Sequence, residues 1–339
     1  MLAEGCALFL AVSILFYCLF AGADFGAGIL EAFRGRKRRE DQRALITHAI
    51  GPVWEANHVW LILAIVILFV GFPKAYAEVS TVFHIPLTLM LFGIVLRGCA
   101  FTFRHYDAVK DGSQKIYSRI FVVSSFLTPF ALGTVAGAIF LGKRMKPAAS
   151  FADAYVLPWA NAFSFSVGIF ACVLFSFLAA VYLIGETEDR ELRQIFVKRA
   201  KVINLLAVVS GAAVFLAAEA EGLGLMAGFV RDPLALASMV AATLLLAPLW
   251  LWLGRRPTLL ARAAAASQVA LILIGWLKLQ YPALLNDFSA GGTPFAYKAV
   301  AAPEATLEAL LWALAVGSAL IFPALFYLMR VFKREADPT

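Results

Sequence analysis

Long runs of apolar residues dominate the chain and alternate with short polar segments. A helix needs about 20 mostly apolar residues to cross the hydrocarbon core of a bilayer, and nine stretches reach or approach that length. Their approximate bounds are 6–29, 56–72, 80–102, 120–142, 159–184, 202–221, 233–253, 264–284 and 305–331. The pattern predicts an all-α integral membrane protein with nine transmembrane helices.

The composition agrees with this pattern and narrows the class of protein. Hydrophobic residues make up 62% of the 339 positions and charged residues 15%, whereas soluble domains have roughly 45–50% and about 25%. A soluble enzyme, a disordered scaffold and a secreted disulfide-rich domain are therefore excluded. The four cysteines all lie in apolar stretches without a C-x-x-C motif, so neither a disulfide nor a metal site is expected. We also expect no cleaved signal peptide, because the first apolar run lacks a basic segment and exceeds signal length.

The basic residues gather in alternate loops. Of the 29 Lys and Arg residues, 21 lie in the segments after spans one, three, five, seven and nine, 7 lie on the other side, and Arg97 lies within the third span. Because basic loops stay in the cytoplasm, we expect the N-terminus outside and the C-terminus on the cytoplasmic side of the membrane. The net charge of +7 then reflects orientation in the bilayer, and no nucleic-acid partner is expected.

The whole chain, 1–339, is expected to form a single polytopic membrane domain. No segment has the composition of a linker between soluble domains, and the longest outer loop, 285–303, is rich in turn-forming residues. Any chemistry is therefore expected within the membrane or at its edge.

Charged side chains at membrane depth cost several kcal/mol unless they are paired or hydrated, so the few present are candidate functional groups. Asp24 lies between Gly22 and Gly26, which are four residues apart on one helix face and allow a neighbouring helix to approach closely. Two interpretations of Asp24 stay open. It is a buried, hydrogen-bonded acid in a packing motif, or it carries a proton or ion, and one residue could do both.

The second span begins among polar residues. The Gly51-Pro52 pair is expected to break the helix before this span, which leaves residues 40–50 as a short interfacial helix. The break would place the start of the span close to the inner membrane surface.

Glu55 and His58 are three residues apart, on one face of the second span and within contact distance. Trp54 and Trp60 flank them, and tryptophan is typical of membrane interfaces. A carboxylate beside an imidazole at the inner mouth of a span suits a proton entry point. The alternative is a cluster that caps the helix and anchors it at the interface.

The direction of the spans indicates which polar groups meet. Spans one and three run inward and span two runs outward, so Asp24, Glu55, His58 and Arg97 all fall near the cytoplasmic side. Arg97 is therefore expected to have a structural and electrostatic role, in which it neutralises Asp24 or Glu55.

Other candidates fall on the outer side. His84 begins the third span and should differ in depth from His58 by on the order of 20 Å, so these two cannot ligate one haem iron. A single histidine with a Met or exogenous ligand stays open. Glu219 and Glu221 end the sixth span, either as a hydrated helix end or as an outer exit for ions or quinol protons.

At these residues the sequence resembles subunit II of the cytochrome bd-type quinol oxidases. Three motifs carry the resemblance: Gly-Ala-Asp-Phe-Gly-Ala-Gly at 22–28, Gly-Pro-Val-Trp-Glu-Ala-Asn-His-Val-Trp at 51–60, and Leu-Arg-Gly-Cys-Ala-Phe-Thr-Phe-Arg at 96–104. The resemblance extends over essentially the whole chain. It is most specific in the Trp-acid-x-Asn-x-Val-Trp pattern, where the family usually has Asp at the position of Glu55.

The resemblance implies two four-helix bundles plus one peripheral helix, with the first bundle at roughly 1–142 and the remainder at roughly 159–331. It also implies a heterodimer with a haem-bearing subunit I, which holds b-type and d-type haems and oxidises quinol with O2. In this arrangement subunit II has no catalytic residue, metal or haem of its own. A small single-span subunit and a structural quinone or lipid stay open, so any cofactor-binding residues are unknown.

The resemblance further implies that Glu55 lies on a proton path from the cytoplasm to the oxygen-reducing haem, with Asn57, His58 and Asp24 as its neighbours. The expected function is that of the haem-free, stabilising subunit of a quinol:oxygen oxidoreductase. The rival is a secondary transporter that uses Asp24, Glu55 and Arg97 around a broken helix. Their grouping near one membrane surface, rather than at the midplane, counts against the transporter.

Overall fold

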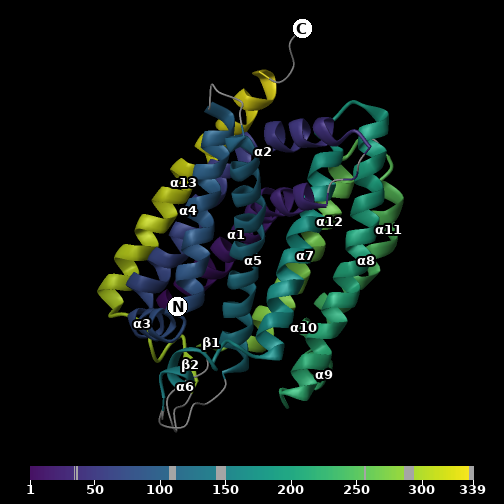
Figure 1. Cartoon of the computed structure of the whole chain (residues 1–339). Coiled ribbons are helices and arrows are strands. Elements are labelled where there is room, and N and C mark those ends of the chain that lie inside the picture. Colours follow the sequence, from purple (N-terminus) through teal and green to yellow (C-terminus); the bar gives the residue numbers. More distant parts are fainter. Residues whose placement is uncertain are drawn as a thin grey trace.

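The structure is a computed structural model, and it describes residues 1–33, 35, 37–106, 112–142, 150–255, 257–285 and 294–335. Within helices, the side chains of residues 51–56, 105–106, 325–326 and 328–335 lie outside this description, while their backbone is helical. Helices dominate the described residues (Figure 1).

Eight long helices form the body of the molecule. They are α1 (Leu2–Ala32), α2 (Arg39–Gly71), α4 (His84–Tyr106), α5 (Ser113–Leu141), α7 (Ala162–Ile184), α8 (Arg190–Ala220), α12 (Leu259–Gln280) and α13 (Glu304–Glu335). The shorter helices are α3 (Pro73–Val82), α6 (Phe151–Tyr155), α9 (Leu225–Arg231), α10 (Pro233–Leu244) and α11 (Leu246–Trp252). Two short antiparallel strands, β1 (Ala283–Leu285) and β2 (Phe295–Ala296), complete the fold.

The described residues contain eight helical segments long and apolar enough to cross a membrane, with α10 and α11 together forming one of them. A ninth is present if the second half of α2 and the bent helix α3 are counted as one span. The all-α membrane architecture expected from the hydrophobic pattern is confirmed.

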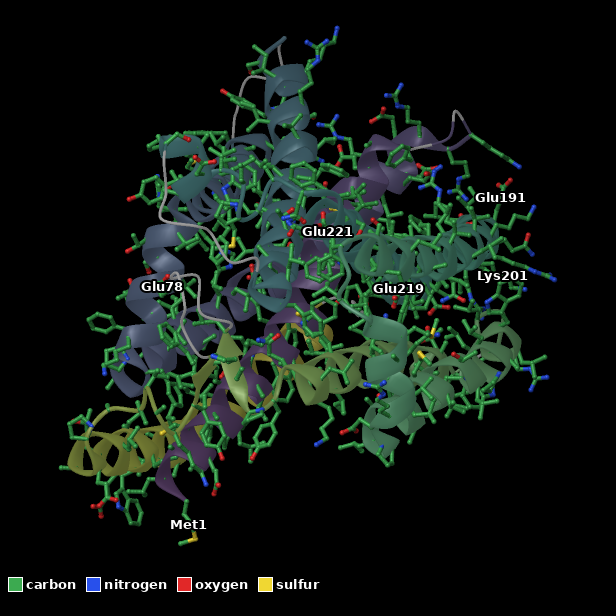
Figure 2. The ribbon with its side chains drawn as sticks, turned by 90° about the horizontal axis from the view of Figure 1, so that it is seen from below. Met1, Glu78, Glu191, Lys201, Glu219 and Glu221 are labelled. Carbon is green, nitrogen blue, oxygen red and sulfur yellow. The ribbon has the colours of Figure 1, made fainter. Side chains whose placement is uncertain are left out.

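We name two sets of helices by their order in the chain: α1, α2, α4 and α5 are called the first bundle, and α7, α8, α10, α11 and α12 are called the second (Figure 1). Helix α7 packs against α1 and α5 as extensively as against α8. Helix α13 packs on the flank of the first bundle, against α1 and α2. Viewed from below in Figure 2, Glu191 and Lys201 of α8 lie on the opposite side of the molecule from Met1.

A close approach of two backbones joins the bundles. A Cβ atom on Gly26 would overlap the carbonyl group of Phe175 in α7, and one on Gly22 would overlap the side chain of Leu178. The glycine face of α1 therefore packs directly against α7, because only a residue without a side chain leaves enough room.

Ion pairs at the end of α1 and the start of α8 link the two bundles a second time. Asp189 caps the first turn of α8, accepting hydrogen bonds from the backbone N–H groups of Glu191 and Leu192 at 2.9 and 3.0 Å. The same carboxylate pairs with Arg38, which precedes α2. The Arg38 guanidinium and the backbone donors hold the pKa of Asp189 below its usual range.

The expected helix break at Gly51-Pro52 is wrong. Helix α2 is continuous from Arg39 to Gly71, so the segment 40–50 is the first part of a longer helix. Proline removes only one backbone donor, and helices within a membrane tolerate it when neighbouring groups satisfy the freed carbonyl.

The real change of direction comes twenty residues later. After Phe72 the chain bends by 117° into α3, which begins with Pro73 at its first position. Proline favours helix starts because its fixed φ angle suits the first turn, where its missing N–H would have no partner. Strands β1 and β2 lie at the same end of the molecule (Figure 1), where Leu285 and Tyr297 pack into one hydrophobic cluster with Phe72.

Candidate functional site

The first bundle contains a fully buried ion pair between α1 and α4. Asp24 is 0% exposed and Arg97 is 1% exposed. The two terminal nitrogens of Arg97 donate to the two carboxylate oxygens of Asp24 at 2.9 and 2.5 Å, and one of them also donates to the backbone carbonyl of Asp24 at 2.9 Å. This two-pronged geometry is the strongest form of an arginine–carboxylate contact. The structure thus gives Arg97 the partner Asp24.

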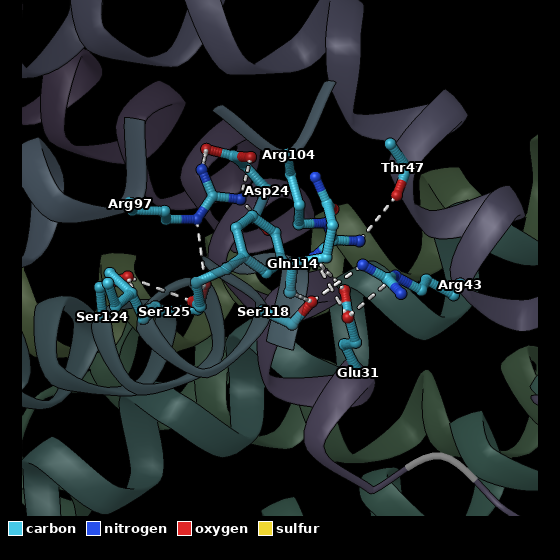
Figure 3. Close-up of polar contacts among 12 residues, drawn as sticks. Asp24, Glu31, Arg43, Thr47, Arg97, Arg104, Gln114, Ser118, Ser124 and Ser125 are labelled. Carbon is cyan, nitrogen blue, oxygen red and sulfur yellow. Dashed lines mark hydrogen bonds and ion pairs between the residues drawn. The ribbon is translucent and has the colours of Figure 1, made fainter. Parts of the chain in front are cut away.

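Neutral groups complete the shell of this pair. Asn57 of α2 donates its amide nitrogen to Asp24 at 2.5 Å, and the Nε of Arg97 donates to Ser125 of α5 at 3.0 Å. A Cβ on Gly28 would overlap the hydroxyl of Ser125, so this glycine leaves space for the serine. All four helices of the first bundle therefore contribute to the environment of one charge pair (Figure 3).

A second acid–arginine pair lies two turns further along the same helices. Arg104 donates to both oxygens of Glu31 at 3.1 and 3.0 Å and to the hydroxyl of Thr47 at 2.9 Å. Arg43 of α2 reaches the same carboxylate at 3.9 Å. The side chain of Glu31 is 0% exposed. We call the two pairs, Asp24–Arg97 and Glu31–Arg104, the charge ladder.

One aromatic ring separates the two arginines of the ladder. Phe121 of α5 has the guanidinium carbon of Arg97 at 4.8 Å and that of Arg104 at 4.9 Å from its ring centre. The negative face of an aromatic ring attracts such cations, by about 2 kcal/mol or more when they are desolvated. Phe121 thus stabilises both guanidinium groups while keeping them apart.

Glu31 and Arg104 were not among the expected site residues, although the sequence contains a signal for them. Glu31 follows Asp24 by seven residues, and Arg104 follows Arg97 by the same interval. Seven residues are close to two helical turns, so each pair of like residues lies on one helix face. The repeated interval predicts two parallel rungs once the first pair is recognised.

Of the residues expected at the inner mouth of the second span, the structure describes the side chain of His58 but not those of Glu55 and Trp54. The contacts of Glu55 and Trp54 therefore stay predictions. His58 is partly exposed and lines a cavity of about 390 Å³ with Gly98, Cys99 and Thr102 of α4.

Trp60 packs in the interior of the protein. It is 4% exposed, stacks on Phe16 with ring centres 4.5 Å apart, and contacts Phe322 of α13 at 5.6 Å. The sequence suggested that Trp60 lies at the membrane interface. In the structure its ring is instead covered by α1 and α13.

The outer candidates lie apart from the ladder. His84 at the start of α4 has its Nδ1 2.9 Å from the carbonyl of Thr81 and its ring 5.0 Å from that of Tyr155. Glu219 accepts a hydrogen bond at 3.1 Å from the backbone N–H of Met226, which fits a helix end (Figure 2). Within the described part of the chain, no group of three His, Cys, Asp or Glu side chains is arranged to hold a metal ion.

The second bundle has a polar core of another kind. Asn204 accepts from the indole of Trp250 at 2.8 Å and donates to Gln268 at 3.3 Å, and Gln268 donates to the carbonyl of Ala242 at 3.0 Å. Asn204, Gln268 and Ala242 line a cavity of about 260 Å³, whose other lining residues are apolar apart from Ser238 and Thr243. The network is neutral and holds helices together, but it offers no group that titrates near neutral pH.

The chemistry available to the chain therefore concentrates in the first bundle. Its buried ions are paired, which makes them part of the structure, and Asn57 connects them to α2 two residues after Glu55. A family model for the cytochrome bd terminal oxidase subunit II matches residues 2–332, almost the whole chain. The chain belongs to the cytochrome bd subunit II family. In this chain, the buried pair and the acid motif of α2 belong to one segment, residues 22–104.

Two named cytochrome bd oxidase subunits are similar in sequence to this chain over part of their length. The cytochrome bd ubiquinol oxidase subunit 2 of Bacillus subtilis (strain 168) is 31% identical over 169 residues, which cover 49% of this chain and 48% of the relative. The cytochrome bd-I ubiquinol oxidase subunit 2 of Escherichia coli (strain K12) is 27% identical over 135 residues, 40% and 35% of the two chains. The matched segment thus spans half or less of these relatives.

A comparison of folds gives a similarity that covers nearly the full chain. A chain in the structure of bd oxidase from Geobacillus thermodenitrificans superimposes with a TM-score of 0.75 at 20% sequence identity, and the match covers 98% of both chains. At this identity the likeness concerns the fold alone.

Proposed function

We propose that this chain is the haem-free subunit of a membrane quinol:oxygen oxidoreductase, in which it stabilises a haem-bearing subunit I and conducts protons from the cytoplasm. The observation that carries the proposal is the match to the subunit II family over residues 2–332. The described geometry adds two supporting features. One is the buried charge ladder, and the other is the polar side chain of His58, which lines a cavity that opens at the surface of the protein.

Glu55 is the proton-carrying group in this proposal, with Asn57, His58 and Asp24 beside it. The oxygen of the Asn57 amide is buried and has no protein partner within the described residues, and the same holds for the indole nitrogen of Trp60 one turn later. Buried polar atoms of this kind are where proteins hold ordered water. A file of such waters between Glu55 and Asn57 would let a proton pass from one group to the next.

Subunit I would dock on the face of α2 and α4. This face exposes Leu91 and Phe92 to 58% each and Val95 to 52%, and it includes the cavity lined by His58, Gly98 and Thr102. Small and polar residues at membrane depth fit a protein partner better than lipid tails. The haems and the quinol site would belong to that partner, together with any small single-span subunit.

The histidines of this chain support the placement of the haems in the partner. His58 borders the part of α4 from Gly98 to Thr102, whereas His84 begins that helix. The interval of 14 to 18 residues corresponds to roughly 20–27 Å along the helix. The two rings therefore cannot share one iron.

The orientation is proposed from the loops, with the N-terminus outside and the C-terminus in the cytoplasm of a bacterial inner membrane. The 21 basic residues expected on the cytoplasmic side support it. In this orientation the ladder and Glu55 lie in the inner leaflet, where protons for O2 reduction would enter.

The test replaces Glu55 by Gln in the purified complex, which keeps the shape of the side chain and removes its proton. Quinol oxidation by O2 should slow by roughly tenfold or more, while the haem spectrum and the subunit content stay unchanged. Glu55→Asp should slow it less, and the matched control Glu308→Gln on the exposed face of α13 should leave the rate at its original value. Full turnover of Glu55→Gln from about pH 6 to pH 8 would place the proton route elsewhere, with Asp24 as the next candidate.

The rival transporter function is separated by a second measurement. The tagged chain is purified from its native membrane, and its visible spectrum and subunit count are recorded. A co-purifying haem-rich partner supports the oxidase. A haem-free preparation in which this chain alone accumulates a solute in vesicles would replace it with the transporter.

A further inference from the structure

A cavity of about 510 Å³ lies between the start of α2 and the start of α5, beside the end of α1. Four cationic residues line it: Arg39 and Arg43 from α2, and Lys115 and Arg119 from α5. The members of each pair are four residues apart, so each helix turns one basic face to the same space. Of the described residues, Glu31 is the one member of the charge ladder that lines this cavity, and none of those in the proposed proton path lines it.

The acids in the lining do not cancel this charge. Arg104 of the ladder donates to Glu31 at 3.0 and 3.1 Å and compensates its charge, whereas the lining residue Arg43 approaches this carboxylate only to 3.9 Å. Glu40 lies in the first turn of α2, next to Arg39. The four cations outnumber the two acids, and the cavity as a whole attracts anions.

A buried donor points to an occupant. The amide nitrogen of Gln114 is shielded from solvent but has no hydrogen-bond partner among the residues that the structure describes, and the residue lines the cavity. Figure 3 shows Gln114 beside Ser118, Arg43 and Glu31. A shielded N–H group without an acceptor costs free energy, and an anionic oxygen in the cavity would satisfy it.

The helix ends add to the preference for an anion. Both α2 and α5 begin at this cavity, and neither has a side chain that caps its first turn. The unpaired N–H groups of a first helical turn, and the positive end of the helix dipole, stabilise a nearby phosphate. Two such ends beside four cations and an unpaired amide make a site for a phosphate group.

The surroundings decide between a soluble anion and a lipid. Val122 and Val123 continue the lining along α5, and Val123 is 63% exposed. Ile116, also on α5, is 58% exposed. The cavity therefore opens at the boundary between the polar headgroup layer and the hydrocarbon layer, where basic pockets between helices bind lipid headgroups.

We infer that this cavity binds the phosphate headgroup of an anionic phospholipid from the leaflet in which α1 ends, with the acyl chains lying along α5 beside Val123. The occupant links α1, α2 and α5 at the end where the charge ladder reaches the membrane surface. The inference does not depend on proton conduction through Glu55.

The test uses the complete oxidase complex, stripped of lipid in detergent, and measures binding by native mass spectrometry and by thermal shift. Phosphatidylglycerol should bind and raise the melting temperature. Phosphatidylcholine should do neither, because its headgroup carries no net charge. Inorganic phosphate at the same concentration should also do neither, because it lacks the acyl chains. If phosphate binds as tightly as phosphatidylglycerol, the site is one for a soluble anion and the lipid assignment is wrong.

Variants locate the site. Lys115→Gln with Arg119→Gln should weaken phosphatidylglycerol binding by roughly fivefold for each charge removed, and Gln114→Leu should weaken it without any change of charge. Arg119→Lys should retain it. The matched control Lys198→Gln removes an exposed cation from α8, away from the cavity, and should leave binding unchanged. Equal weakening by Lys198→Gln and by Arg119→Gln would show general attraction to a basic surface and overturn the proposal.

Discussion

The cores of the two bundles contain buried polar groups of opposite character. In the first bundle they are ions, Asp24 with Arg97 and Glu31 with Arg104. In the second they are the neutral amides of Asn204 and Gln268. A charge in a membrane costs far more to leave unpaired than an amide, and helices rarely keep one without a function or a strict structural need. The buried charges therefore concentrate in the first bundle, whereas the buried amides of the second bundle serve to pack its helices together.

The largest loss of stability is expected for Arg97→Leu, which leaves Asp24 buried without its cationic partner. The cost should be about 3–5 kcal/mol, and the complex should fail to assemble, as measured by the yield of haem-containing complex. The double variant with Asp24→Leu removes both charges and should recover a large part of that yield. Normal assembly and turnover of Arg97→Leu would show that the pair is dispensable.

The contact between the bundles gives the next largest effect. Gly26→Ala would push a methyl group into the carbonyl of Phe175, so α1 and α7 must separate, at a cost of about 1–3 kcal/mol. The apparent melting temperature of the complex should fall accordingly. Gly317→Ala on α13 is the matched control, because nothing lies within 4 Å of the added atom. Equal melting temperatures for the two variants would contradict the close packing of α1 on α7.

A smaller effect is expected in the second bundle. Gln268→Leu removes the acceptor for Asn204 and the donor to Ala242, and interhelical hydrogen bonds in membranes contribute about 0.6 kcal/mol on average and about 1.7 at most. The variant should therefore assemble, keep its haem spectrum and melt only slightly earlier than the parent. A loss as large as that of Arg97→Leu would erase the distinction between the two cores.

The sequence alone predicts the long helices and the first buried charge pair, but the second pair is harder to find. The apolar runs predicted the long helices because a membrane imposes length and composition on any span. Asp24 and Arg97 could be found because single charges are conspicuous among apolar residues. Glu31 and Arg104 lie near the polar loops, where a charge is ordinary, so only their seven-residue spacing distinguishes them.

Other features depend on contacts that no local pattern records. Trp60 is covered by Phe322, which lies more than 250 positions later in the chain. Gly51-Pro52 resembles a helix end, but α2 continues through it, and helices within a membrane tolerate the loss of one backbone donor. The pairing of Arg38 with Asp189 likewise joins two loops 151 residues apart.

The smallest effect is expected for the ion pair between Arg38 and Asp189, which joins the two bundles at the protein surface. Asp189→Asn keeps an oxygen to cap α8 but removes the charge that pairs with Arg38. The folded pKa of Asp189 is lowered, so its charge stabilises the fold above the unfolded pKa of about 3.9, and this contribution is lost as the pH falls through the folded value.

The melting temperatures of the parent and Asp189→Asn should therefore differ slightly at neutral pH and at about pH 5, and should converge below about pH 4. Glu308→Gln, which removes an exposed carboxylate from α13, serves as the control. A difference that grows as the pH falls would contradict the lowered pKa.

The spacing of the charge ladder also fixes how α4 can slide past α1. Both pairs join residues 73 positions apart, and they follow in the same order along the two helices. In this register each arginine faces one acid. A slip of α4 by two turns in one direction would pair Arg97 with Glu31 and leave Asp24 buried without its partner. A slip in the other direction would pair Arg104 with Asp24 and leave Arg97 buried without its partner. Apolar side chains alone tolerate many offsets between two helices, whereas four charges at matching intervals favour a single alignment of α4 on α1.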